Sequence, residues 1–445
     1  MTRPSPPNAL RRVLARLDGV AQANATTPVP DHETVPGHRI ALICVGISFT
    51  LTTLYTGSAL AATLGLRTGI LAVVIGSLLL AVMSIPAALL GARTRLSTYM
   101  IVAHVFGGVG ARLVNAVLAL VLLGWFAVTA ELFGRTFFLT VSTALPALAW
   151  PQPVWTIACS VAVVATTIFG FRAIDRLSLA IAPLLVALTA WVAWRSLGHA
   201  SWATLMAVKG TQVDLGTGIS AVIGGMIVNV VLMPDITRYA RSAFDCAVIG
   251  ITGNGIGAGA ALVLAMIPAL AFGEQDPMRY MAALGLTGLA FTTLVLSTWT
   301  LNAINLYSTS LVTSTALRGV SYGRLVVACG VVGTGVALVG VADRLIDFLV
   351  LLGVIVPPIA AVYLADYFVL GRRALGAVAA ATNVNGLAAC AVGAALGLVL
   401  DWRHASWTGV PTIESFVCAA LVYLLAEAMR ASLARDRTWR RPLQA

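Results

Sequence analysis

The sequence predicts an all-α integral membrane protein with about twelve transmembrane helices, and three observations support this fold class. Of the 445 residues, 59% are hydrophobic and only 10% are charged, and the mean hydropathy is +0.94. A soluble domain of this length carries roughly a quarter charged residues. The apolar residues come in blocks of about 18 to 28, enough to cross about 30 Å of hydrocarbon. The 41 glycines and 18 prolines lie largely inside these blocks, where membrane bundles tolerate them.

The blocks predict twelve spans between two polar tails, residues 1–38 and 431–445. The expected spans cover residues 39–64, 68–92, 112–138, 153–171, 177–198, 216–239, 247–273, 284–311, 324–342, 345–370, 377–400 and 411–430. The stretch from Arg93 to Arg112 is less apolar, and we expect it to lie along the cytoplasmic face. The polar start has no apolar core of the signal-peptide type.

The distribution of basic residues predicts the orientation of these spans. With the N-terminus inside, seven of the 28 basic residues fall on the outer side and the other 21 on the inner side. The outer set is Arg67, Arg135, Arg195, Lys209, Arg279, Arg344 and Arg403. Both termini are therefore expected in the cytoplasm.

The net charge of +11 first suggests a nucleic-acid partner, but the basic residues lie at the ends of apolar blocks and form no basic domain. No nucleic acid is therefore expected as a partner. The six cysteines are scattered singly without a C-x-x-C pair, which favours buried apolar positions over metal or disulfide roles. We expect no cofactor and no metal beyond a coupling Na⁺.

Two spans of opposite direction contain stretches that weaken a helix near mid-membrane. In span 1 the stretch runs from Gly46 to Thr53, and in span 6 it runs from Gly224 to Asn229. Interrupted helices at matching positions of two halves indicate the site of an inverted-repeat transporter. The alternative is close helix packing through small residues.

Five motifs in matching order resemble the nucleobase–cation symporter 1 family, most closely its bacterial cytosine permease branch, over about Val35 to Leu425. They are V-G-I-S-F-T-L-T-T-L-Y-T-G (Val45 to Gly57), L-G-W-F (Leu123 to Phe126), P-D-I-T-R-Y-A-R (Pro234 to Arg241), W-T-L-N-A-I-N-L-Y (Trp299 to Tyr307) and V-P-P-I-A-A-V-Y-L-A-D-Y (Val356 to Tyr367).

The resemblance implies a leucine-transporter-type fold and alternating access. Residues 39–198 then form a first five-helix repeat, 216–370 a second, inverted one, and 377–430 two additional helices. It also implies a bacterial inner-membrane location and one substrate site between spans 1, 3, 6, 8 and 10. We expect a monomer.

For the substrate, the resemblance implies stacking on Trp125 of span 3; the alternative is core or lipid-facing packing. The amide common in relatives is absent here, because Leu122 and Thr129 take the candidate positions. Met226 replaces an aromatic residue, and Asn229 either binds substrate or bridges to another helix. The remaining substrate-binding candidates are Ser48, Thr52, Asn302 and Asn305.

For the coupling cation, the resemblance implies carbonyl oxygens of span 1, at Gly46 and Phe49, with hydroxyls of span 8. Ser297 and Thr300 offer such oxygens, whereas Leu301 replaces a hydroxyl residue. The coupling ion is therefore sodium or a proton.

Glu131 lies inside span 3 where relatives have a small apolar residue. A carboxylate at this depth is costly and indicates a function. It pairs with Arg135 one turn away, or it is a protonatable coupling site, or it balances a cationic substrate.

These observations predict a symporter that imports a small, planar, nitrogen-rich solute such as cytosine, coupled to Na⁺ or H⁺. The alternative is an importer of a cationic amine or guanidino compound with Glu131 as counter-charge. A membrane-embedded enzyme is a remote third hypothesis, because no acid–base pair lies inside the bundle. The chain has no G-x-x-x-x-G-K-S/T loop for an ATP-driven pump and no repeated polar rings for a channel.

Overall fold

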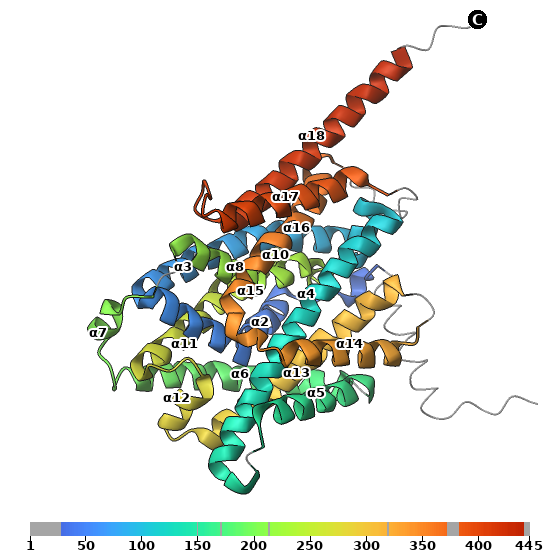
Figure 1. Cartoon of the computed structure of the whole chain (residues 1–445). Helices are drawn as coiled ribbons and strands as arrows, with labels where there is room; N and C mark the ends of the chain where they lie inside the picture. Colours follow the sequence, from blue (N-terminus) through green and yellow to red (C-terminus); the bar gives the residue numbers. More distant parts are fainter. Residues whose placement is uncertain are drawn as a thin grey trace, which may run out of the picture.

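The chain folds as a bundle of long helices in a computed structural model (Figure 1). The structure describes residues 28–148, 150–169, 171–211, 214–317, 320–371 and 382–439, and no β-strand occurs in these ranges. The helices of the first half are α2 (Gly37–Ser48), α3 (Leu51–Thr94), α4 (Thr98–Ala144), α5 (Gln152–Phe169), α6 (Phe171–Ser196), α7 (Trp202–Ala207), α8 (Leu215–Val231) and α9 (Met233–Thr237). The second half contains α10 (Ala243–Ile249), the π-helix η3 (Gly250–Gly257), α11 (Ala258–Phe272), α12 (Pro277–Ala283), α13 (Thr287–Ala316), α14 (Tyr322–Ala337), η4 (Val341–Arg344), α15 (Leu345–Ile355), α16 (Pro357–Leu364), the π-helix η5 (Ala365–Val369), α17 (Val384–Trp402) and α18 (Pro411–Trp439).

Each of the twelve predicted spans falls on helix in the part of the chain that the structure describes. Within the described ranges, seven helical stretches are long and apolar enough to cross a membrane unaided, among them Ala243–Phe272 and Val341–Val369, and four shorter apolar helices accompany them. Helix α18 continues past the predicted end of span 12 to Trp439. Residues 1–27 of the predicted N-terminal tail and the start of predicted span 11 lie outside the described ranges.

Two glycines with positive φ bend the longest helices into separate segments. Gly65 (φ 73°, ψ 174°) divides α3 into the second half of span 1 and span 2, and Gly107 (φ 74°, ψ 173°) sets the segment from Thr98 off from span 3. An L-residue with a side chain strongly disfavours this backbone region, so glycine allows the chain to turn sharply between helices. The segment before Gly107 buries Ile101, Val102 and Phe106.

Span 1 is interrupted where the sequence predicts an interruption. Helix α2 ends at Ser48, Phe49 leaves the helical region (φ −96°, ψ 87°), and Thr50 is extended (φ −133°, ψ 161°). The Thr50 hydroxyl then accepts the Thr53 N–H at 3.3 Å and begins α3 as its N-cap. The break thus takes the Phe49 carbonyl out of the helical ladder, whereas the Gly46 carbonyl accepts the Phe49 N–H at 3.3 Å.

The predicted interruption of span 6 is in the wrong place. Helix α8 is continuous from Leu215 through Gly224 and Asn229 to Val231, and the break falls at Leu232 (φ −89°, ψ 6°), before Pro234. Gly224 instead lets α8 approach α15, because a Cβ built there would stand 1.7 Å from the Leu349 carbonyl oxygen. The small-residue packing alternative is therefore correct for this stretch, and the proline that follows marks the end of the helix.

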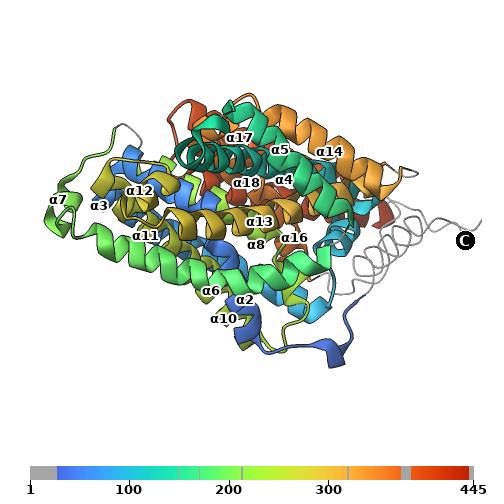
Figure 2. The ribbon, with the colours of Figure 1, turned by 90° about the horizontal axis from the view of Figure 1, so that it is seen from below.

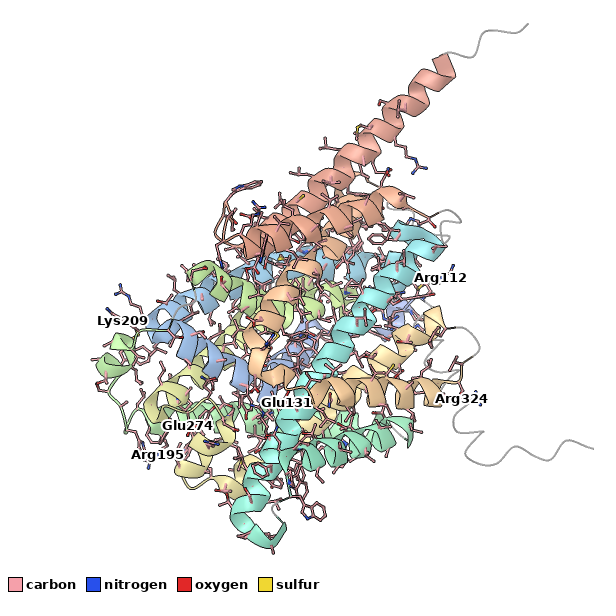
Figure 3. The ribbon with its side chains drawn as sticks, viewed as in Figure 1. Arg112, Glu131, Arg195, Lys209, Glu274 and Arg324 are labelled. Carbon is pink, nitrogen blue, oxygen red and sulfur yellow. The ribbon has the colours of Figure 1, made fainter. Side chains whose placement is uncertain are left out.

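The helices pack into a core in which segments distant in sequence lie side by side. Helix α3 packs against α8 and α11, α4 against α13, and α8 against α15. Figure 1 shows α17 and α18 together at one edge of the bundle, and Figure 2 shows α6 passing alongside α11 and α2. Figure 3 shows Arg112 and Arg324 of the predicted inner set toward one end and Arg195 and Lys209 of the predicted outer set toward the other, with Glu131 between them.

Candidate substrate and cation site

A cavity of about 420 Å³ lies beside the break in span 1, and we call it the break cavity. All four residues predicted to bind the cation line it: Gly46, Phe49, Ser297 and Thr300. Its other walls come from α2, from α6 around Pro183, and from Leu301 and Ile304 of α13. The fold therefore brings the unwound segment of span 1 and the hydroxyl-bearing face of span 8 to one cavity.

The oxygen atoms in the break cavity suit a hard cation. The Ser297 hydroxyl donates to the Leu294 carbonyl at 3.0 Å, and the Thr300 hydroxyl donates to the Leu296 carbonyl at 2.8 Å. Because each hydroxyl uses its proton on its own helix, its oxygen lone pairs remain available. Together with carbonyl oxygens at the end of α2, these atoms are the kind of ligand set that hard cations take.

Trp125 lies near the middle of the part of α4 that follows Gly107, far from either end of the helix. It is half-buried, and its ring meets Phe348 of α15 edge-on, with centroids 5.5 Å apart and an interplanar angle of 79°. The two rings are therefore nearly perpendicular. The arrangement suits an aromatic side chain that stacks on a flat ring, although the neighbour Phe348 was not predicted from the sequence.

Several predicted substrate residues carry buried polar atoms without a hydrogen-bond partner. These atoms are the Thr52 and Thr129 hydroxyls and both amide atoms of Asn302, and Thr129 and Asn302 are fully buried. Unpaired polar atoms inside a membrane protein cost free energy, so they indicate a ligand or water. Thr129 lies one turn from Trp125 on α4, and Asn302 lies on α13, which packs against α4.

The other predicted substrate residues are buried or half-buried, and some of their polar groups have partners within their own helix. Asn229 donates to the Met226 sulfur at 3.6 Å, a weak bond within α8 that does not bridge to another helix. The Ser48 hydroxyl donates to the Cys44 carbonyl at 3.0 Å, within α2. Asn305 is buried one turn from Asn302. Thus Ser48 ends α2 at the first break and Asn229 lies near the second, but within the described part of the chain no hydrogen bond or ring contact joins Met226, Asn229 or Ser48 to Trp125.

Glu131 is buried, with 2% of its surface exposed, and both of its carboxylate oxygens have partners. Oε1 accepts from Arg135 at 2.5 Å, and Oε2 accepts the Ala342 backbone N–H of η4 at 2.8 Å. The same Arg135 nitrogen also donates to Asp343 at 2.6 Å. Glu131 and Arg135 therefore tie α4 to the segment that leads into α15, and this geometry favours the ion-pair interpretation over a free carboxylate.

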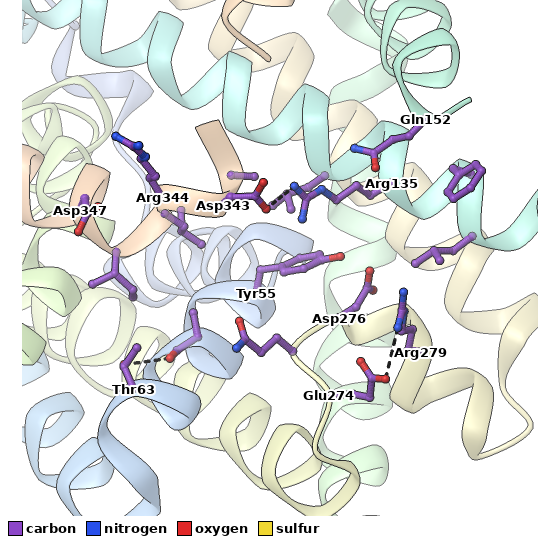
Figure 4. Close-up of a pocket in the computed structure, with 18 of the residues that line it drawn as sticks. Tyr55, Thr63, Arg135, Gln152, Glu274, Asp276, Arg279, Asp343, Arg344 and Asp347 are labelled. Carbon is purple, nitrogen blue, oxygen red and sulfur yellow. Dashed lines mark hydrogen bonds and ion pairs between the residues drawn. The ribbon is translucent and has the colours of Figure 1, made fainter. Parts of the chain in front are cut away.

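A second cavity, of about 680 Å³, lies toward the predicted outer end, and we call it the Asp276 pocket (Figure 4). Its polar lining comes from α3, α4, the start of α5, the segment that leads into α12, α12 itself, η4 and the start of α15. The polar residues are Tyr55, Thr63, Arg135, Gln152, Glu274, Gln275, Asp276, Arg279, Asp343, Arg344 and Asp347. Of these residues, the sequence analysis gave an individual role only to Arg135, as a partner of Glu131, and named Arg279 and Arg344 only as members of the outer basic set.

The family is shown by comparison with known proteins. The sequence model of a family described as permease for cytosine/purines, uracil, thiamine and allantoin matches residues 28–423. The chain belongs to this family. It is a multi-pass membrane permease of the nucleobase–cation symporter 1 type and not an enzyme.

Cytosine permeases of Escherichia coli K12 and O157:H7 are each 27% identical to this permease over 406 residues, covering 89% of this chain and 92% of theirs. Mhp1, a nucleobase-cation-symport-1 family transporter, has a similar structure. Its closed conformation with bromovinylhydantoin bound has a TM-score of 0.77 at 20% identity, covering 92% of this chain and 96% of Mhp1. Its inward-facing conformation has a TM-score of 0.81 at 19% identity, covering 94% and 97%. The fold is therefore the leucine-transporter type with two additional C-terminal helices.

Sequence reasoning on this permease missed the residues that reach the site from far along the chain. Phe348, Ala342 and Asp343 lie more than 200 positions from Trp125 and Arg135, so no local pattern connects them. Asp276 carried a usable signal, because Asp276–Pro277 is the pattern of a helix start, and its side chain does accept the Met278 N–H at 2.8 Å. Tyr55 lies inside a motif that was read for its glycines and hydroxyls.

Proposed function

We propose that this permease imports a small planar nitrogen heterocycle, a nucleobase such as cytosine, by cation-coupled alternating access. The observation that carries the proposal is Trp125, a half-buried indole at mid-span, beside the unpaired buried hydroxyl of Thr129. A flat ring stacked on the indole and hydrogen-bonded at its edge matches these two chemistries. The relatives named above as cytosine permeases support the same substrate class.

The cation that we propose is sodium, bound in the break cavity by the Gly46 and Phe49 carbonyls and the Ser297 and Thr300 hydroxyls. The supporting observation is that both hydroxyls already donate within α13 and so present only lone pairs. Sodium bound there would hold the unwound end of α2 against α13. Leu301 has no side-chain oxygen and would not bind the ion. A protonatable carboxylate is less well supported, because both oxygens of Glu131 are occupied by donors.

We further propose that the permease is a monomer in a bacterial inner membrane, with both termini in the cytoplasm. Support for the orientation comes from Arg112 and Arg324 of the predicted inner set, which lie toward one end of the bundle, and Arg195 and Lys209 of the outer set, which lie toward the other (Figure 3). The Arg112 end then faces the cytoplasm, and the Asp276 pocket faces the outside.

Binding of labelled cytosine to the purified protein tests the substrate class. The panel is cytosine, other nucleobases and hydantoins against small guanidino compounds and amines. Trp125→Ala should weaken cytosine binding by about tenfold or more, because a stacked base contributes about 1–3 kcal/mol. Trp125→Phe, which keeps an aromatic face, should recover part of the affinity. Binding of only the guanidino compounds or amines, unchanged in both variants, would refute the nucleobase assignment.

A further inference from the structure

The Asp276 pocket and Trp125 lie along the same two helices, α4 and α15. Leu132 lines the pocket and lies seven residues from Trp125 on the same face of α4, about 10 Å along the helix. Helix α15 closes the path between them: Leu345, Ile346 and Asp347 line the pocket, and the next residue, Phe348, packs on Trp125. A solute in the pocket is therefore one aromatic side chain away from the indole.

Two of the three basic side chains of the pocket are paired with carboxylates, whereas Arg344 and the Asp276 carboxylate make no ion pair among the described residues. Arg135 binds Glu131 and Asp343, and Arg279 binds Glu274 at 3.4 Å. Among the described residues no basic side chain lies within 4 Å of Asp276, whose Oδ1 accepts the Met278 N–H. A carboxylate in such surroundings attracts N–H donors and repels anions.

Tyr55 provides a second recognition group from a different element. Its side chain comes from α3, points toward Asp276 and lines the same pocket (Figure 4). It is 8% exposed, and its hydroxyl lies near the Asp276 carboxylate without a hydrogen bond of ordinary geometry to any partner. A buried hydroxyl without a partner costs free energy, so the hydroxyl and the carboxylate together form a polar edge that a ligand or water completes.

We propose that Asp276 and Tyr55 form a second solute site, which holds the incoming heterocycle before it reaches Trp125. This inference rests on the proposed function, because the ligand is the same class of solute: a planar ring with an N–H donor next to a carbonyl acceptor. The Asp276 carboxylate accepts the N–H, and the Tyr55 hydroxyl donates to the carbonyl. Movement of Phe348 with α15 then opens the way to Trp125.

Initial rates of labelled cytosine uptake into proteoliposomes test this site, using the full chain and three variants. Asp276→Asn removes the charge but keeps an oxygen for the Met278 N–H, so α12 keeps its cap. Tyr55→Phe removes only the hydroxyl. Glu274→Gln is the matched control, because Glu274 lines the same pocket but is more exposed and paired with Arg279. Size-exclusion profiles confirm that each variant is folded.

Asp276→Asn and Tyr55→Phe should each lower kcat/KM by about five- to tenfold, the effect of one lost hydrogen bond, and change the saturated rate less than twofold. Glu274→Gln should match the wild type. Equilibrium binding should give two cytosines per wild-type chain and one per Asp276→Asn chain. If the wild type transports cytosine and both variants keep its kcat/KM, only water fills the pocket. That result would overturn the second solute site but not the proposed function. A wild type that transports no nucleobase or hydantoin would overturn the proposed function, and this inference with it.

Discussion

Glu131 shows how one buried side chain can join two helices. It receives the Arg135 guanidinium from its own helix and the Ala342 N–H from η4, while only 3% of its side chain is exposed. A buried charge that loses its partner is costly, whereas an exposed pair contributes little. The carboxylate therefore stabilises the contact between α4 and the start of α15, which carries Phe348.

Glu131→Gln should destabilise the protein by about 1–3 kcal/mol, because a charge-assisted contact to Arg135 is lost in a buried place. The measurement is the thermal unfolding midpoint in detergent. Asp343→Asn, which alters the exposed partner of the same arginine, should cost at most about 1 kcal/mol. The dependence of transport on pH and on the sodium gradient should stay as in the wild type. A lost pH dependence in Glu131→Gln would instead make this residue the proton-coupling site.

Asp276 predicts a pH dependence of solute capture. Burial raises the pKa of this carboxyl above its ordinary value of 3.8, against the opposing effects of Tyr55 from α3, Arg135 from α4 and Arg279 from α12; Tyr280 is also near. The raised pKa means that the folded protein favours the protonated Asp276 carboxyl. The contribution of this group to folding stability is therefore complete at pH values below the ordinary pKa, and it is lost as the pH rises through the pKa of the folded state. Solute capture depends on pH in the opposite direction: it increases as the pH rises, because it needs the ionised carboxylate.

The kcat/KM of cytosine uptake should therefore fall as the pH is lowered through the raised pKa of Asp276. Uptake rates at low cytosine concentration, measured from acidic to neutral pH with the sodium gradient held constant, check this expectation. The Asp276→Asn variant should lack this fall of kcat/KM at acidic pH. An identical acid limb in the variant would assign the titration to another group.

At the scale of helices, the two neighbouring glycines of α8 differ in how closely another helix approaches them. Gly224 faces the Leu349 carbonyl oxygen, whereas a Cβ on Gly225 would meet only the end of the Leu349 side chain at 4.0 Å. Both glycines were first read as one helix-weakening stretch, but the helix runs through them. Alanine substitutions at these two positions therefore distinguish the effect of close helix packing from the effect of helix propensity.

Gly224→Ala should prevent correct folding or lower the unfolding temperature sharply, because α8 and α15 must move apart to admit a methyl group. Gly225→Ala should be neutral or stabilising by up to about 1 kcal/mol, through better helix propensity. Expression level and detergent stability of the two variants give the comparison. Equal tolerance of both substitutions would show that α8 and α15 are less closely packed than described.

Features whose physical cause lies within a few consecutive residues could be predicted from the sequence, whereas contacts between distant segments could not. The hydrophobic blocks locate the spans, and the polar run around Phe49 and Thr50 locates the break of span 1, because both signals lie within a few consecutive residues. The Glu131–Arg135 pair follows from one-turn spacing. The break near Pro234 was misplaced because glycine has two uses, and the Phe348 contact depends on the packing of α15 against α4, which no local pattern encodes.

At the scale of the whole molecule, the two cavities lie along different halves of span 1, one after its break and one before it. The Asp276 pocket is separated from the indole by Phe348, and the break cavity follows α2 back to Leu42. In the proposed orientation the first faces the outside and the second lies along the inner half of span 1. This arrangement fits a transporter in which access to one central site alternates between two ends.

The orientation can be tested with single cysteines in a background lacking the six native ones. A cysteine at Lys209 should react with an impermeant thiol reagent added to intact cells, because this position lies at the predicted outer end (Figure 3). A cysteine at Arg324, at the opposite end, should react only after permeabilisation. The reverse pattern would invert the topology and place the Asp276 pocket on the cytoplasmic side.

The central claim, sodium-coupled import of a nucleobase, is tested most directly by cytosine uptake into proteoliposomes under an imposed sodium or proton gradient. A sodium gradient alone should drive accumulation in the wild type, and Thr300→Ala should lose most of this dependence because the break cavity loses one hydroxyl ligand. Accumulation driven only by a proton gradient, or uptake of guanidino compounds or amines without any nucleobase, would contradict the account.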